Sequence, residues 1–178
     1  AKTMVEKYFA SIPSGASIMR KEAWVPQLDG IRRGTMQDNV SLARVYYAFP
    51  TPGYYTPGDA EMDIVANTLT SGKTSRLYKS LVYDKQIAQD VAAFQSSGEL
   101  CGMFILYATV REGHTVEAVE QALDAELKKI VAEGMTATEL VNTQAQYEAG
   151  FVRSLENLGN RADKMNEYNT FLGDPNKF

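Results

Sequence analysis

An almost uninterrupted apolar run from Met103 to Ala108 is the feature that most constrains the fold of this chain. A strand with apolar residues on both faces is typical of the interior of a sheet rather than its edge. Residues 87–96 also have strand character, and the turn-forming residues 97–100 separate them from a strand over 103–111. We therefore expect a hairpin whose second strand is central and covered on both faces.

Two earlier stretches, residues 31–38 and 40–49, also have strand character. Asp38-Asn39 is a turn-forming pair between them, so we expect a first hairpin here. The Pro-Thr-Pro-Gly segment at 50–53 then ends the second of these strands, because proline cannot donate to a ladder of backbone hydrogen bonds.

Helical spacing of apolar residues follows each hairpin. Thr56 is suited to cap a helix with Pro57 at its first helical position, and Thr136 with Glu139 forms a capping box for a later helix. Gly134, where a left-handed conformation is easy, ends the helix before that box. The expected helices cover about residues 5–12, 57–69, 77–82, 116–130, 137–158 and 162–172.

Helices segregated from mostly antiparallel strands predict an α+β fold, with one mostly antiparallel sheet and helices packed on one of its faces. The helical pattern starts at nearly the first residue, so we expect the chain to be part of a longer protein. Residues 14–26 mix Pro, Gly, Ser and charge without a period, which is typical of a linker. Trp24 within it is expected to anchor the linker to a surface.

The composition excludes several classes of protein. With 44% hydrophobic and 22% charged residues, the 178-residue chain can bury a core and is not expected to be disordered. A net charge of -4 without a dense Lys/Arg cluster argues against a nucleic-acid partner. No stretch approaches the ~20 consecutive apolar residues of a membrane span. Cys101, the single cysteine, has no disulfide partner and is expected to be a small buried apolar residue.

Histidine chemistry is excluded most directly, because the chain has one histidine, His114. A histidine-based metal site needs two or more side chains aimed at one point, such as neighbours one turn apart on a helix. His114 follows a predicted strand, and Thr115 is a suitable cap for the next helix. We therefore predict a loop position for His114, and no catalytic or metal-binding residue in this chain.

The other polar clusters of the sequence are more typical of exposed helix faces and turns than of a catalytic or phosphate-binding site. Carboxylates gather on two predicted helices among alternating charges, which favours solvated helix faces over acid-base catalysis. These are Asp59, Glu61 and Asp63 on one helix, and Glu117 and Glu120 on the other. The Gly-Lys-Thr-Ser segment at 72–75 follows a helix and lacks the earlier glycine of a phosphate-binding loop, so we reject that function.

Four tyrosines lie in and after the predicted first hairpin: Tyr46, Tyr47, Tyr54 and Tyr55. Such a stripe could line a groove for a peptide, because each ring is apolar and carries a polar tip. The strand propensity of tyrosine favours packing in the core or at its rim instead.

Three segments carry recognisable motifs. Residues 5–15 are VEKYFASIPSG, residues 71–81 are SGKTSRLYKSL, and residues 134–140 are GMTATEL. In this order they resemble KYFG-x-IP-x-G, GK-x-SRLY-x-x-L and EG-x-T-x-x-EL, which occur in the insulinase/pitrilysin-type zinc metallopeptidases, or inverzincins. The resemblance covers nearly the whole chain.

The resemblance implies that residues 1–13 are the terminal helix of a preceding zinc-bearing domain, 14–30 a linker, and 31–178 a non-catalytic domain. In the family, two similar α+β halves close around a peptide, and H-x-x-E-H with a distant glutamate holds zinc in one half. Water activated by that Zn²⁺ attacks the peptide carbonyl, with the motif glutamate as general base. We therefore expect the zinc in the preceding domain or in a partner subunit, and no cofactor in this segment.

Two positions are implied to face the substrate. Many relatives carry LRE-x-x-x-LAY after the SRLY helix, and its arginine and tyrosine reach toward the bound peptide. The corresponding residues here are Val82 and Gln89. We therefore expect no direct transition-state help from this chain. A steric and backbone role in holding an extended peptide is retained, because strand addition depends mainly on main-chain hydrogen bonds.

The leading hypothesis is a substrate-binding and closure half of a zinc metalloendopeptidase, whose partners are the zinc-bearing domain and a peptide substrate. Two alternatives stay open: a protease-derived scaffold or core subunit without proteolytic activity, and an unrelated α+β binding module. An H-x-x-E-H sequence encoded upstream or in a neighbouring gene would favour the protease. A periplasmic location is suspected from the family alone.

Overall fold

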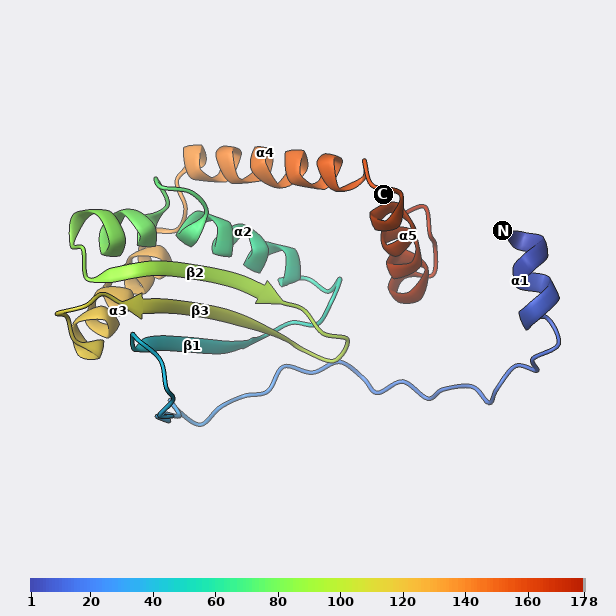
Figure 1. Ribbon diagram of the computed structural model, residues 1–178, viewed down its shortest axis with the longest axis horizontal. Coiled ribbons are helices and arrows are strands. Elements are labelled where there is room, and N and C mark those ends of the chain that lie inside the picture. The colour runs from blue at the N-terminus through green and yellow to red at the C-terminus, as the bar shows by residue number, and fades with distance from the viewer. Residues whose placement is uncertain (178) are drawn as a thin grey trace.

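Three antiparallel strands form the sheet, in the order β1-β3-β2 (Figure 1). The computed structural model describes residues 1–177, and the fold is α+β, as predicted. Its elements are α1 (Lys2–Phe9), β1 (Arg44–Thr51), α2 (Asp59–Thr70), the π-helical segment η1 (Tyr78–Asp84), β2 (Ala88–Ser96), β3 (Gly102–Val110), α3 (Val116–Glu133), α4 (Ala137–Ser154) and α5 (Leu158–Leu172).

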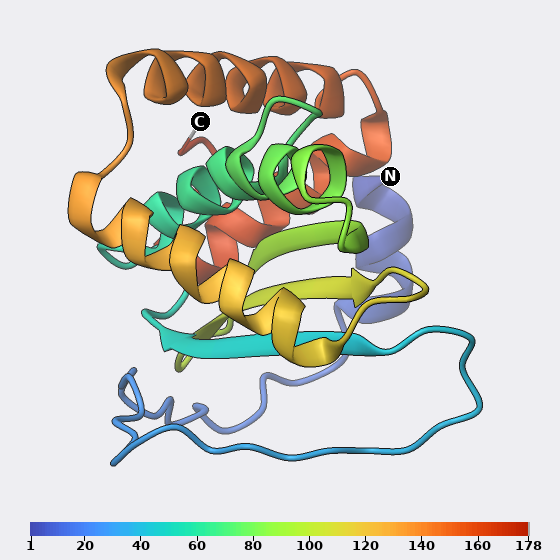
Figure 2. The same ribbon diagram turned by 90° about the vertical axis from the view of Figure 1, so that its left-hand side faces the viewer.

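β3 is the central strand, as its apolar sequence predicts, because it pairs with both β1 and β2. Leu106 and Ala108 of β3 are buried together with Val45 and Val91 of the neighbouring strands. α2, η1 and α3 pack on this face, and α4 lies outside α2 (Figure 2). The prediction that helices pack on one face of the sheet is therefore confirmed. The prediction that β3 is covered on both faces is wrong, because Met103 on the opposite face is 45% exposed.

The first predicted hairpin does not form. Residues 31–38 have no strand structure, and β1 begins at Arg44 rather than at Val40. The partner of β1 is β3, which is distant in sequence. A strand needs a neighbour to satisfy its backbone hydrogen bonds, and no strand within residues 1–177 pairs with the segment around the exposed Ile31.

The predicted start of α2 is also wrong, because Gly58 and not Thr56 is the N-cap. Gly58 has a φ of 98°, a conformation that favours glycine, and its N–H donates to Oε2 of Glu61 at 3.0 Å. The Thr56 hydroxyl instead donates to a backbone carbonyl three residues earlier, at 2.5 Å. The short helix predicted over 77–82 is the π-helical segment η1, which extends to Asp84.

The later elements follow the prediction closely. The second hairpin forms between β2 and β3. Thr115 Oγ1 accepts a hydrogen bond from the Ala118 N–H at 3.2 Å and caps α3, which ends at Gly134 with a φ of 71°. Thr136 and Glu139 make the predicted capping box of α4. These signals are local in sequence, so they can be read without knowing the tertiary structure.

Residues 10–43 connect α1 to β1 without helix or strand (Figure 1). α1 buries no residue, and the domain boundaries after residues 13 and 30 stay a prediction.

The prediction that the Trp24 side chain anchors the linker is wrong. The ring is exposed, and only the backbone N–H of Trp24 bonds to the Leu100 carbonyl, at 2.9 Å. Cys101 is half-buried rather than buried. Within the described chain, no helix has the length and apolar character needed to span a bilayer.

Candidate functional site

A groove of about 1950 Å³ lies between the segment 28–43, strand β1 and helix α3. Figure 2 shows this segment passing below β1. Arg33 of the segment and Glu120 of α3 both line the groove, and Nη1 of Arg33 donates to the two carboxylate oxygens at 3.0 and 3.1 Å. Tyr46 and Tyr47 of β1 line the groove too, and Tyr46 is exposed, so these tyrosines lie at the rim rather than in the core.

The outer edge of β1 borders this groove. The Val110 N–H donates to the Ala43 carbonyl at 2.9 Å, so the odd-numbered residues of β1 hydrogen-bond to β3 in the antiparallel alternation. The backbone groups of Tyr46 and Ala48 therefore point outward, and no further strand of the described chain pairs with them. Pro50 occupies another outward position, where its missing N–H costs no ladder hydrogen bond.

The opposite edge of the sheet is partly closed. Thr70, the last residue of α2, places its Oγ1 where it accepts a hydrogen bond from the Ala93 N–H of β2, at 3.0 Å. A backbone donor that is already paired cannot bind an incoming strand. At Ala93, β2 therefore offers no free donor to an additional strand, whereas the outward groups of Tyr46 and Ala48 of β1 are not paired with a strand of the described chain.

The two predicted substrate-facing residues, Val82 and Gln89, line one pocket of about 460 Å³. Val82 belongs to η1, whereas Gln89 lies in β2 where the register against β3 shifts between Ala88 and Asp90. Such a bulge turns a side chain out of the regular alternation of the strand. The pocket adjoins the groove, because Leu42 and Gln89 line both. Contact of these residues with a substrate stays a prediction.

One carboxylate differs from the prediction of solvated helix faces. Asp59 is only 6% exposed, and its carboxylate accepts hydrogen bonds from Ser97 Oγ at 2.5 Å and Gln95 Nε2 at 3.1 Å. The Tyr55 N–H donates a third, at 3.0 Å. Asp59 therefore joins the start of α2 to the end of β2, whereas the neighbouring Glu61 is exposed, as predicted.

His114 lies in an exposed turn between β3 and α3, where its backbone N–H donates to the Arg111 carbonyl at 3.1 Å. The predicted loop position is confirmed. Across residues 1–177, no group of three or more His, Cys, Asp or Glu side chains is arranged to hold a metal ion.

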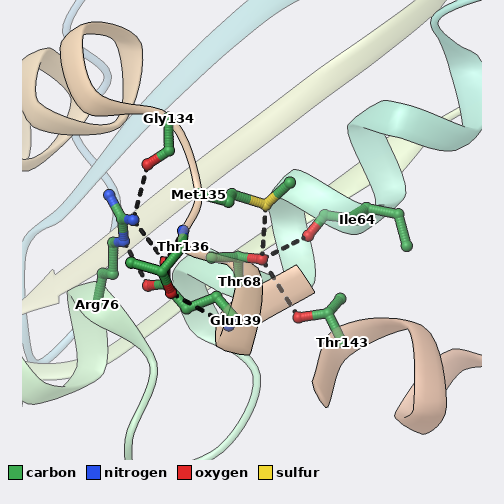
Figure 3. Close-up of polar contacts among 8 residues, drawn as sticks. All are labelled: Ile64, Thr68, Arg76, Gly134, Met135, Thr136, Glu139 and Thr143. Carbon is green, nitrogen blue, oxygen red and sulfur yellow. Dashed lines mark hydrogen bonds and ion pairs between the residues drawn. The ribbon is translucent and has the colours of Figure 1, made fainter. Parts of the chain in front are cut away.

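A second polar cluster, away from the groove, fixes α4 to the core (Figure 3). Arg76 of the SRLY motif donates from Nε and Nη2 to the two oxygens of Glu139, both at 2.6 Å, and from Nη2 to the Gly134 carbonyl at 2.8 Å. The bond from Arg76, with further bonds from Thr136, lowers the pKa of Glu139 to about 2. The capping box can be predicted from the sequence, but this ion pair cannot, because 63 residues separate its partners.

Comparisons with known proteins agree with this architecture. Residues 1–147 match the family described as "Peptidase M16 inactive domain". The zinc protease PqqE of Helicobacter pylori is 24% identical over 144 residues, which are 80% of this chain and 32% of that protein. The uncharacterized zinc protease YmxG of Bacillus subtilis is 24% identical over 113 residues, 64% of this chain and 27% of that protein. A crystal structure of a protease from Helicobacter pylori has a TM-score of 0.82 at 22% identity, covering 94% of this chain and 41% of that one.

The structural likeness shows a shared α+β fold, and residues 1–177 contain no metal-binding cluster. The chain belongs to the family of peptidase M16 inactive domains. It spans only 27% and 32% of the length of the two curated relatives, so most of each relative lies outside the matched region.

Proposed function

We propose that this chain is the substrate-holding and closure half of a zinc metalloendopeptidase. Zinc and its ligands would then lie in a preceding domain of the same polypeptide or in a partner subunit. Two facts support this division of labour: the matched family is that of the inactive domain, and the relatives named above are zinc proteases.

The observation that carries the proposal is the unpaired edge of β1 beside the groove. An extended peptide can add to this edge as a strand, using the outward backbone groups of Tyr46 and Ala48. The groove volume of about 1950 Å³ exceeds the ~300–1,000 Å³ of a typical small-molecule pocket, which favours a polypeptide ligand. Main-chain pairing would also explain why Val82 and Gln89 can replace more specific side chains.

Adding this chain to its separately purified zinc-bearing half should restore cleavage of a fluorogenic peptide. With the substitution Ala48→Pro, the restored kcat/KM should be about fivefold lower, because one main-chain hydrogen bond to the peptide is worth ~1 kcal/mol. Pro50 shows that this edge accommodates proline at an outward position. The matched control is Ala48→Val, which keeps the N–H and suits a strand.

Two outcomes would contradict the proposal: full activity of the zinc-bearing half by itself, or equal restoration by Ala48→Pro and the wild-type chain. Thermal melting of both variants separates lost binding from lost folding. A scaffold without proteolytic function predicts no cleavage in any combination. A periplasmic location is a separate proposal, which cell fractionation would check.

The chain by itself should bind no stoichiometric zinc, because the described residues hold no cluster of metal-ligating side chains. We expect metal analysis after equilibration with zinc and removal of the excess to find far less than one ion per chain. Finding about one tightly bound ion per chain would place the metal centre in this segment and contradict the proposed division of labour.

A further inference from the structure

The small pocket next to the groove is lined by an arginine, Arg111. The pocket is lined by Leu42, Val82, Ala88, Gln89, Arg111 and Glu112. Arg111 directly follows the last residue of β3, and its backbone N–H donates to the Ile87 carbonyl at 2.9 Å. The backbone at this rim of the pocket is therefore held by the end of the sheet, while the long side chain is exposed.

The guanidinium of Arg111 has no carboxylate partner within 4.0 Å among residues 1–177. Two arginines of the adjoining groove are occupied: Arg33 pairs with Glu120, and Arg44 bonds to Thr109. Arg32 also lacks an ion pair in the described chain, but it lies on the segment without helix or strand. Among the residues that line this pocket, Arg111 is thus the cation, and its backbone is held at the end of β3.

The chemistry of the pocket suits a carboxylate. A guanidinium binds a carboxylate through two parallel N–H donors, and the side-chain amide of Gln89 can supply another donor from the same pocket. Leu42 and Val82 add apolar surface beside these donors, which the aliphatic part of a peptide side chain can contact. Glu112 is the opposing element, because its negative charge repels the same ligand.

We propose that Arg111 binds a carboxylate of the peptide substrate where the groove meets the pocket. This gives the domain a preference for peptides with an acidic side chain, or a free carboxyl terminus, at that point. The inference rests on the proposed function, because it names the substrate class of the same peptide site. Arg111 is therefore a specificity-determining residue and takes no part in the hydrolytic step.

Fluorescence polarisation with the purified chain tests this proposal on three labelled peptides that differ only at one side chain and at the carboxyl terminus. The first has glutamate and an amidated terminus, the second has glutamine and an amidated terminus, and the third has glutamine and a free carboxyl terminus. The wild-type chain should bind at least one carboxylate peptide about fivefold to tenfold more tightly than the neutral one. The glutamate and free-terminus peptides show which source of the carboxylate is used. Arg111→Gln should abolish the preference, and Glu112→Gln should increase it.

Two further variants make the test specific to this pocket. The double variant Val82→Arg with Arg111→Gln returns a guanidinium to the same pocket from η1 and should restore part of the preference. Arg153→Ala removes an exposed arginine on α4 and should leave the preference unchanged. Arg111 is exposed, so its substitution should not affect folding, and circular dichroism checks this.

The outcomes separate this inference from the proposed function. Equal binding of all three peptides by the wild-type chain, or an unchanged preference in Arg111→Gln, would overturn the role of Arg111 while leaving peptide binding intact. Failure of the wild-type chain to bind any of the peptides, even when joined to its zinc-bearing half, would overturn both.

Discussion

Replacing Arg76 with alanine should destabilise the fold by about 2–4 kcal/mol, because it leaves the partly buried carboxylate of Glu139 without its cation and without two hydrogen bonds. The Arg76 side chain is 16% exposed and that of Glu139 is 29% exposed, so water replaces the lost bonds only in part. The pair joins the segment before η1 to the start of α4 (Figure 3). Equilibrium unfolding in urea measures the loss.

The matched control is Arg20→Ala. Arg20 pairs with Glu99 at the same 2.6 Å, but the two side chains are 56% and 49% exposed. Exposed ion pairs contribute ~0–1 kcal/mol, so this variant should unfold almost as the wild type does. Similar losses for both variants would show that burial of the Arg76 pair adds nothing to its strength.

The same ion pair predicts a dependence of stability on pH. The pKa of Glu139 is about 2 in the folded chain against an ordinary value of 4.5, chiefly because of the hydrogen bond from Arg76. A folded-state pKa below the unfolded value means that the stabilisation is complete above about pH 4.5 and is lost as the pH falls toward 2. Glu139→Gln should therefore lose stability less steeply over this range, which melting temperatures at several pH values would show. Parallel curves for the two proteins would contradict it.

Truncating Leu106 to alanine should cost about 2–5 kcal/mol, because the cavity left in the centre of the sheet cannot collapse fully. Leu106 is 0% exposed and lies on the face of β3 that the helices cover. Native domains are stable by only ~5–15 kcal/mol, so this change removes a large share of the total. Urea unfolding at constant pH gives the value.

Met103→Ala is the control for the two faces of β3. Met103 points to the open face and keeps nearly half of its surface in contact with solvent. Its truncation should cost much less than that of Leu106, since little apolar area returns to water. A cost as large as that of Leu106 would mean that the open face is covered, and would contradict the packing of helices on only one face of the sheet.

Local signals were sufficient for much of the fold. The apolar run of β3 placed this strand inside the sheet, and Thr115 and Thr136 marked the starts of α3 and α4. Each of these signals acts within a few residues. A capping residue hydrogen-bonds to the first turn of its own helix, and the apolar side chains of a strand indicate that the strand is buried. From β1 onward, the order of helices and strands therefore followed from the sequence.

The predictions that were wrong share a different cause. Residues 31–38 have strand character but no neighbouring strand in the described chain, and Asp59 looks like a surface carboxylate until β2 brings Ser97 and Gln95 to it. Strand pairing and the burial of a polar group both depend on residues distant in sequence. Spacing along the chain contains no information about such partners.

For the candidate site, the sequence by itself determined that one histidine cannot build a metal centre, and the resemblance to zinc peptidases pointed to Val82 and Gln89. Only the tertiary structure decided that these two residues share a pocket with Arg111, and that the edge of β1 lies open beside it. The physical reason is that the bulge at Gln89, the end of β3 and the start of β1 meet only when the strands have paired.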